Sequence, residues 1–145
     1  MKFLSGNKEI HEVFGLDDVM QIHTRGVVEA GKFPEIEFSI MLKNKYCSYM
    51  EFGSVQLKYN SRSKIFQMSN VYVSPQYRNR GYGKQMISLA VDYAKEYKPV
   101  GVFSVVFKTS DPTAVLVCKS CGFGATYYDK HKNVWNMERG IWLDC

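Results

Sequence analysis

The sequence predicts one α/β domain over residues 1–145, with a mixed central sheet flanked by helices. Three observations predict this fold class. Residues 54–59 alternate apolar and polar side chains, which is typical of a half-buried strand. From Met86 to Tyr97 the apolar residues recur at helical spacing. Residues 100–107 are almost continuously apolar, which is typical of a strand covered on both faces. Strands and helices in this order indicate an α/β domain.

The composition places the chain among ordinary globular proteins. Of its 145 residues, 46% are hydrophobic and 23% are charged. No apolar run approaches the ~20 residues needed to cross a bilayer. The first ten residues carry Lys2, Lys8 and Glu9, unlike a secretory signal. We therefore expect a soluble, cytoplasmic protein with no membrane partner.

The N-terminal third predicts a short strand, a helix and a second strand. Residues 10–14 could form the first strand. Residues 15–18 indicate a helix start, because early acidic residues favour the positive end of the helix dipole. The apolar residues between 16 and 28 follow at mixed helical spacing, and Gly31 and Pro34 close the helix. For residues 38–42 we expect a strand, with a short helix as the alternative.

The remaining elements follow from turn and cap residues. Residues 54–59 and 64–74 predict an antiparallel hairpin around the turn at 60–63. A long helix starts near Gly83 and ends before Pro99. Asp111 as N-cap, Pro112 in the first turn and Gly122 past the last turn predict a helix over 112–121. Residues 123–129 and 134–141 form a closing hairpin.

Residues 71–84 carry the most informative pattern, Val-Tyr-Val-Ser-Pro-Gln-Tyr-Arg-Asn-Arg-Gly-Tyr-Gly-Lys. A strand ends at Pro75, a basic turn follows, and a helix begins. The first helical turn exposes backbone N–H groups and partial positive charge. Gly81 and Gly83 remove side chains that would hold a phosphate away from this backbone. Three side chains add full positive charge: Arg78, Arg80 and Lys84. The segment therefore predicts a pyrophosphate site.

The alternative to a pyrophosphate site is a purely structural role, in which residues 71–84 form a tight strand-to-helix connection with solvated basic residues. The spacing is neither that of a Walker P-loop nor that of the dinucleotide fingerprint. The net charge of +5 also favours anions in general, including nucleic acid. However, phosphates of a bound cofactor already account for the main basic cluster, so we do not expect a nucleic-acid partner.

Cys118 and Cys121 have the spacing of metal or redox cysteines. A zinc site would need two more ligands, and the sequence contains no second such pair and no closely spaced histidine pair. We therefore expect no metal site, and two cysteines on a buried helix.

The pattern over residues 73–83 resembles the central motif of the GNAT superfamily of N-acetyltransferases, Val-x-Pro-x-Tyr-Arg-x-x-Gly-x-Gly. A second segment, Asp111-x-x-Ala114 followed by Gly122 and Phe123, is similar to the family's Asn-x-x-Ala…Gly-Phe. With the order of elements, the resemblance covers roughly residues 64–141. It implies a GNAT-like fold with a partly splayed sheet, and acetyl-CoA as co-substrate.

The resemblance also implies cofactor contacts. The strand backbone that bonds the pantetheine arm corresponds here to Val71, Tyr72 and Val73. The backbone N–H groups that hold the pyrophosphate correspond to the turn and first helical residues, Asn79, Arg80, Gly81, Tyr82, Gly83 and Lys84. Asp111 stands where the family has an asparagine near the pantetheine. Because aspartate lacks amide donors, a plain N-cap is the alternative role for Asp111.

The catalytic positions depart from the family's pattern. A lysine-like amine costs about 4.6 kcal/mol to deprotonate at pH 7, so a general base normally helps. The two positions where relatives carry a glutamate are Gln67 and Val106 here; Gln67 could orient a water. The tyrosine that meets the leaving thiolate is replaced by Cys118, which is either the catalytic acid or a packing thiol. Tyr127 or Tyr128 could supply the missing phenol.

These features predict an N-acetyltransferase in which a primary amine attacks the acetyl thioester directly. The alternative is a catalytically degenerate acetyl-CoA-binding module with a regulatory or interaction role. The acceptor is not identified: the family builds that groove from regions equivalent to residues 16–34 and 127–136, which carry no recognisable pattern. The oligomeric state also stays open, a homodimer included.

Overall fold

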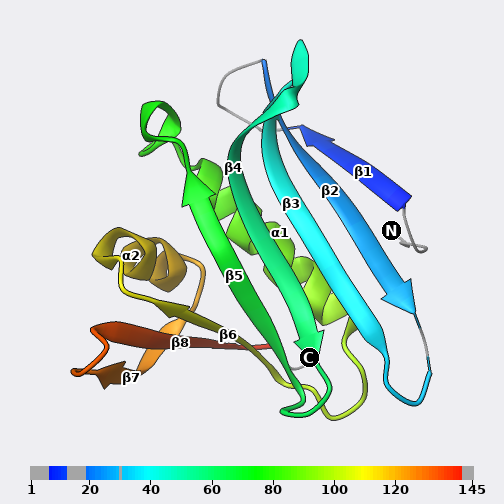
Figure 1. Cartoon of the computed structure of the whole chain (residues 1–145), viewed down its shortest axis with the longest axis vertical. Helices are drawn as coiled ribbons and strands as arrows, with labels where there is room; N and C mark the ends of the chain where they lie inside the picture. Colours follow the sequence, from blue (N-terminus) through cyan, green and yellow to red (C-terminus); the bar gives the residue numbers. More distant parts are fainter. Residues whose placement is uncertain (1–6, 13–18, 30, 142–145) are drawn as a thin grey trace.

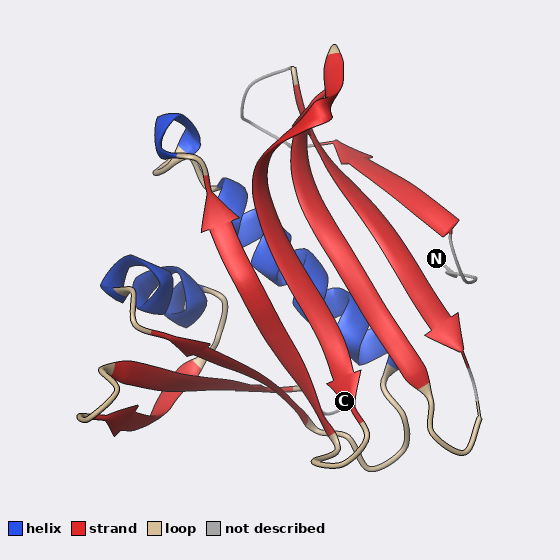
Figure 2. Ribbon diagram, in the orientation of Figure 1, coloured by secondary structure: helices blue, strands red, loops and turns tan. Residues whose placement is uncertain are grey.

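The structure, a computed structural model, describes residues 7–12, 19–29 and 31–141. It consists of a mixed β-sheet with α-helices packed against it (Figures 1 and 2). The strands of the N-terminal half are β1 (Asn7–Glu12), β2 (Met20–Glu29), β3 (Glu35–Asn44), β4 (Cys47–Asn60) and β5 (Ile65–Val73). A short 3-10 turn, η1 (Pro75–Tyr77), leads into α1 (Tyr82–Tyr97). The C-terminal half contains β6 (Ser104–Thr109), α2 (Pro112–Ser120), β7 (Gly124–Asp129) and β8 (Val134–Gly140).

The strand order is β1-β2-β3-β4-β5-β6-β8-β7. The pair β5–β6 is parallel, and the other neighbouring pairs of the described chain are antiparallel. A parallel pair needs a crossover connection, which α1 provides. In Figure 1, α1 lies behind β3, β4 and β5, and α2 lies beside β6. The α/β fold with a mixed sheet is therefore confirmed.

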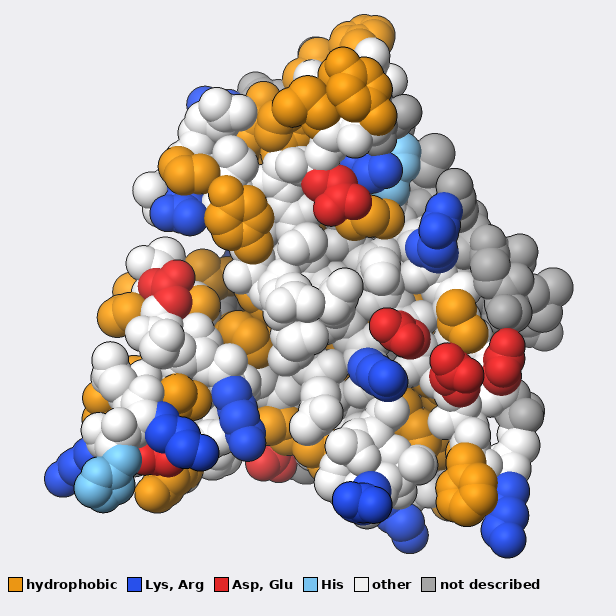
Figure 3. Space-filling view, in the orientation of Figure 1, with side chains coloured by type: hydrophobic (Ala, Val, Ile, Leu, Met, Phe, Trp, Pro, Cys, Tyr) orange, Lys and Arg blue, Asp and Glu red, His pale blue; other side chains and the backbone are white. Residues whose placement is uncertain are grey.

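The core lies between α1 and the rear face of the sheet. Met86, Ala90 and Tyr93 of α1 are buried there, as helical spacing predicts. The ring of Phe38 on β3 stacks on Tyr93 with centroids 4.6 Å apart. The opposite face of the sheet, seen in Figure 3, is mostly polar, because alternate strand residues point away from the core.

The expected helix between residues 16 and 28 is wrong over its described part. Met20–Glu29 forms β2, which pairs with β3 along its whole length. Met20, Ile22 and Thr24 are buried in alternation, which is the period of a strand. The apolar positions of this segment fit either period, and its β-branched residues favour a strand. The predicted helix start at residues 15–18 lies outside the described residues.

The strand predicted over residues 100–107 begins later and has one buried face. Pro99 ends α1 as expected, but Gly101 adopts a φ of +89° in a turn, and β6 starts only at Ser104. Val105 and Phe107 are buried, whereas Val106 between them is half-buried. The uncovered front face of the sheet explains this alternation.

The other predicted elements are confirmed. The strand at 38–42 lies within β3, and the hairpin at 54–74 forms β4 and β5. The first strand, expected at 10–14, is confirmed over residues 10–12 as part of β1, which begins at Asn7; residues 13 and 14 lie outside the described residues. The helix at 112–121 is α2, in which Asp111 caps the first turn. Residues 123–141 form the closing hairpin β7–β8.

Candidate functional site

The strands β5 and β6 separate in the middle of the sheet. They pair only from Phe66 to Met68, opposite Val105 to Phe107. Beyond this point β5 continues to Val73 and β6 to Thr109, and Figure 1 shows the two strands diverging. The backbone of residues 71–73 on the side toward β6 is therefore not paired with that strand. The splayed sheet that the resemblance implies is present.

A β-bulge at Asn70 accompanies this separation. Ser54 pairs with Tyr72 and Gln56 with Ser69, so two residues of β5 stand against one of β4. Asn70 adopts the left-handed conformation with a φ of +51°. Such a bulge bends its strand and increases its twist. The bulge follows shortly after Met68, the last residue of β5 that pairs with β6.

A groove of about 640 Å³ occupies one side of the opening. Its walls are the end of β5, the turn after η1, the first turn of α1, and α2. It is lined by every predicted cofactor-binding residue except Arg80: Val71, Tyr72, Val73, Arg78, Asn79, Gly81, Tyr82, Gly83, Lys84 and Asp111. The structure thus brings two separate sequence motifs together in one cavity.

The turn at the mouth of this groove presents the start of α1. Asn79 and Gly81 both adopt positive φ, +62° and +84°. The first helical hydrogen bond runs from the Gln85 N–H to the Gly81 carbonyl, at 3.1 Å. The N–H groups of Gly83 and Lys84 precede this bond, and in an α-helix such groups have no acceptor within the helix. Amides in this position, with the helix dipole behind them, bind anions.

Arg78 connects the basic turn to the strand. Its Nε donates a 2.8 Å hydrogen bond to the carbonyl of Val73, and its guanidinium lies 5.9 Å from the centre of the Tyr72 ring. The guanidinium of Arg80 lies 5.6 Å from the Tyr77 ring. Arg78 is thereby held at the rim of the groove, where its charge adds to that of the helix start.

The helix α2 forms the wall opposite α1. The Asp111 carboxylate accepts a 2.9 Å hydrogen bond from the Thr113 N–H, as an N-cap does. The same residue lines the groove, so its capping role and its position at the cavity coexist. Ala114 and Val117 face the groove from the next turns of α2.

A family model described as Acetyltransferase (GNAT) family matches residues 34–123. The chain belongs to the GNAT acetyltransferase family. The match begins upstream of residue 64, where the sequence resemblance begins, and it includes β3 and β4. Among curated protein sequences no significant match was found.

Solved structures share the GNAT fold. A putative acyl-CoA N-acyltransferase from Klebsiella pneumoniae matches with a TM-score of 0.60 and 13% identity, over 73% of each chain. A spermidine N-acetyltransferase from Vibrio cholerae, solved with CoA and spermine, matches with a TM-score of 0.59 and 16% identity, over 72% of this chain and 66% of that one. A GNAT acetyltransferase from Staphylococcus aureus Mu50 matches with a TM-score of 0.59 and 16% identity, over 73% and 69%. At these identities the likeness concerns the fold alone.

A second cavity of this GNAT domain, the front pocket, has a volume of about 520 Å³. It lies between the end of β5, β6 and the closing hairpin. Its polar side chains come from three segments far apart in sequence: Asn70, Lys108, Thr109, Ser110, Asp129, Lys132 and Asn136. Val71 lines both the front pocket and the groove, so both cavities reach this residue.

Most of the front pocket was not predicted. The closing segment 127–136 was expected to contribute, and Asp129, Lys132 and Asn136 do line the pocket. Within the described part of residues 16–34, β2 lies on the far side of β3 and β4 from β5, and none of its residues lines the pocket. Asn70 and Lys108 were missed, although asparagine is depleted in strands and enriched at positive φ.

The predicted catalytic residues lie outside both cavities. Gln67 is exposed on β5 and pairs with Val106, in the part of the strands before they separate. Cys118 is completely buried on the core side of α2. Burial, with a smaller contribution from Cys121, raises the pKa of the Cys118 thiol to about 12. This position favours the packing role of Cys118, and a catalytic role for either residue stays a prediction.

The two tyrosines considered as replacements also lie outside these cavities. Tyr127 is exposed, and the Tyr128 hydroxyl donates to the side chain of Asn133. Across the described residues no cluster of histidine, cysteine, aspartate and glutamate side chains could hold a metal ion. No helix in the described part of the chain is long and apolar enough to cross a membrane.

Proposed function

We propose that this chain is an acetyl-CoA-dependent N-acetyltransferase, in which a primary amine attacks the acetyl thioester directly. The observation that carries this proposal is that two cavities of different lining both reach Val71. Direct transfer needs two substrates to reach one point from different sides of the protein. Family membership, and neighbours of the same fold that acetylate amines, support the reaction class.

The groove fits acetyl-CoA. Its mouth offers the amides that start α1, together with Arg78 and Lys84, for the pyrophosphate. A side chain at Gly81 would meet open space, and one at Gly83 would lie 3.5 Å from Val73, so the glycine surface leaves room beside the backbone. Deeper in, the unpaired backbone of residues 71–73 suits the amides of the pantetheine arm. When bound, acetyl-CoA supplies an activated acetyl group.

The front pocket then receives the amine. Asp129 is the carboxylate that lines it. The Asp129 Oδ1 atom accepts hydrogen bonds from the N–H groups of His131 and Lys132, at 3.0 Å and 3.2 Å, which hold the side chain in place. The second oxygen, Oδ2, remains for the substrate amine. We infer that Asp129 takes the proton that the amine must lose before attack.

A steady-state assay tests the proposal. Free thiol released from acetyl-CoA is measured against a panel of primary amines, and binding of CoA is measured by calorimetry. We expect amine-dependent thiol release and formation of the N-acetyl product. CoA binding without turnover of any amine on the panel would contradict the proposal.

The alternative, a cofactor-binding module without catalysis, has one observation in its favour. The family's usual positions for base and acid, Gln67 and Cys118, do not face either cavity. A module of this kind would bind CoA and show no turnover even after Cys118→Tyr, whereas a gain of activity in this variant would indicate a weakened enzyme.

A further inference from the structure

We propose that the acceptor amine carries an anionic group, a carboxylate or a phosphate, which Lys108 and Lys132 bind in the front pocket. The inference rests on the proposed N-acetyltransferase function and names the class of acceptor. It goes beyond that function because family membership says nothing of the charge of the acceptor.

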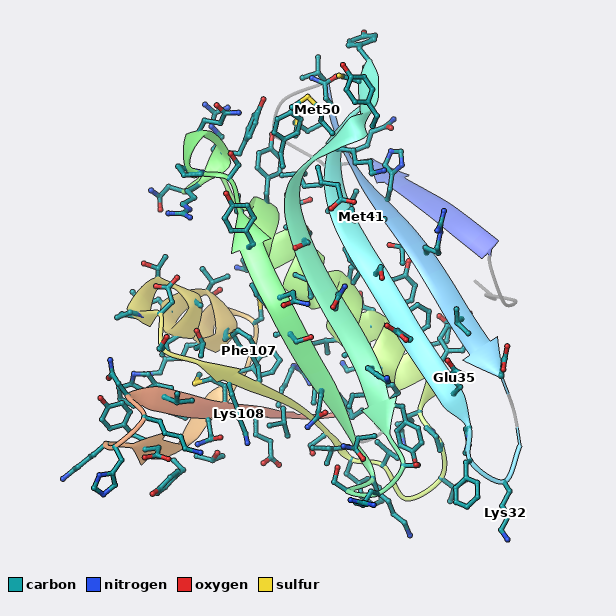
Figure 4. All side chains as sticks on the ribbon, viewed as in Figure 1. Lys32, Glu35, Met41, Met50, Phe107 and Lys108 are labelled. Carbon is teal, nitrogen blue, oxygen red and sulfur yellow. The ribbon has the colours of Figure 1, made fainter. Side chains whose placement is uncertain are left out.

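The front pocket has the size of a small-molecule site. Its volume of about 520 Å³ lies within the range of ~300–1,000 Å³ that such sites occupy. Lys108 follows the buried Phe107 on β6, so alternation turns its side chain away from the core (Figure 4). Lys132 reaches the same cavity from the turn of the closing hairpin. In Figure 3 basic side chains gather over this hairpin, at the lower left of the face shown.

Among the described residues, Lys108 and Lys132 have no carboxylate as an ion-pair partner. The one carboxylate of the pocket, Asp129, already accepts two backbone hydrogen bonds through Oδ1. Counting side chains, the pocket holds two positive groups and one negative group.

This arrangement complements a substrate with one amine and one anionic group. The amine is placed at Asp129, and the polar residues Asn70 and Asn136 line the same cavity. The anionic group is placed at the two ammonium groups, which form short charge-assisted hydrogen bonds with carboxylates and phosphates. An acceptor with several ammonium groups would instead set like charges against the lysines, which disfavours binding.

Equilibrium binding in the presence of CoA tests the inference without turnover. The ligands are γ-aminobutyrate, aminopropyl phosphate, butylamine and spermidine, titrated by calorimetry at low salt. We expect either or both of the anionic amines to bind about tenfold more tightly than butylamine, and spermidine to bind more weakly than butylamine. The first two ligands distinguish a carboxylate from a phosphate preference. The advantage should shrink at 1 M salt, because exposed charges are then screened.

Single variants assign the effect to its residues. Lys108→Gln and Lys132→Gln should each remove most of the advantage of the anionic ligand, and should weaken the anionic ligand without weakening butylamine, because each substitution removes a charge of the same sign as butylammonium. Lys58→Gln, which removes an exposed lysine of β4 outside the pocket, is the matched control. Equal or tighter binding of butylamine or spermidine, or an anionic preference that survives both substitutions, would overturn the inference. Thiol release, measured separately, decides the proposed function itself.

Discussion

The hydroxyl of Ser54 on β4 donates a 2.9 Å hydrogen bond to the backbone carbonyl of Asn70 on β5. Further along β4, past Val55, the Gln56 side chain accepts a 2.6 Å hydrogen bond from the Asn70 Nδ2. The bulge is therefore anchored through both its backbone and its side chain. Asn70 lines the front pocket and its neighbour Val71 lines both cavities, so two polar residues of β4 fix β5 at the place where both cavities lie.

The first prediction concerns Asn70. Asn70→Val places a β-branched residue at a φ of +51°, which we expect to cost at least ~1–2 kcal/mol and to disturb the bulge. Asn70→Gly keeps the backbone conformation and loses only the bond to Gln56. Denaturant unfolding and CoA titration should rank wild type above Asn70→Gly, and Asn70→Gly above Asn70→Val. Equal CoA affinity in all three proteins would show that the bulge does not shape the groove.

Gly53 on β4 lies close to the end of β5 that lines the groove. A Cβ at this position would lie 2.9 Å from the Tyr72 carbonyl and 3.0 Å from the Met86 side chain. Gly53→Ala should therefore destabilise the fold by about 1–3 kcal/mol and weaken CoA binding, since Tyr72 lines the groove. Gly124→Ala, where a Cβ meets open space, is the control and should change stability by less than ~0.5 kcal/mol. Similar urea midpoints for the two variants would refute this account.

Substitutions at Gly81 test whether the turn before α1 binds phosphate. Its φ is +84° and a Cβ at this position would meet open space, so a substitution acts through the backbone alone. We expect Gly81→Ala to cost roughly 1–2 kcal/mol and to raise the Kd for CoA several-fold. Gly81→Asn should do less harm, because asparagine tolerates the left-handed region better. Calorimetry on both variants checks the order, and a reversed order would count against the turn as the phosphate site.

Asp129 tests the chemistry. Asp129→Asn keeps an oxygen that can accept from the His131 and Lys132 N–H groups, so the turn should persist. The lost proton acceptor should lower kcat by about 10²-fold or more, with CoA affinity unchanged. Asp92→Asn, an exposed position on α1, is the control. Full activity of Asp129→Asn would assign the proton transfer to another group or to water.

The raised pKa of the buried Cys118 thiol leads us to expect a loss of stability at high pH. In the folded protein burial raises the pKa of this thiol from 9.0 to about 12. Between these values the unfolded chain loses the proton and the folded chain keeps it. Stability that is present below pH 9 should therefore fall as the pH rises toward 12, by at most ~1.4 kcal/mol per pH unit.

Other groups titrate in the same range, so the difference between variants is the measurement. Cys118→Ala should show a shallower fall in unfolding free energy between pH 9 and pH 11 than wild type. Cys121→Ala, which removes the partly exposed thiol at the end of the same helix, should keep most of the wild-type slope. Parallel slopes for wild type and Cys118→Ala would contradict the prediction.

The parts of the site that could be predicted are local in sequence. The glycines Gly81 and Gly83 and the N-cap Asp111 were recognised from their immediate neighbours in the sequence, and all three line the groove. The front pocket depends on the register of β5, β6 and β8, which no local pattern specifies. The family resemblance put Cys118 at the position of a catalytic tyrosine, but packing decides which face of α2 enters the core. Val115 and Cys118 lie on the core face, whereas Ala114 and Val117 face the groove.

The N-terminal error has a related cause. Val27 and Val28 interrupt strict alternation, so the apolar residues of β2 allowed both a helical and a strand period. Pairing with β3 along ten residues settled the choice, because it provides the backbone hydrogen bonds that the segment needs. For residues 20–29, this pairing outweighs the helical spacing of the apolar side chains.

In the sheet the two halves of the molecule are joined by three parallel residue pairs of β5 and β6. The first half is the β1–β5 meander with α1, and the second is β6 to β8 with α2. A ligand lodged in the groove contacts both halves, since its walls come from β5, α1 and α2. Such a ligand bridges the two halves beside their short β5–β6 pairing, and its binding free energy adds to the free energy of unfolding. The concentration of such a ligand would then raise the resistance of the folded protein to unfolding, in addition to any effect on turnover.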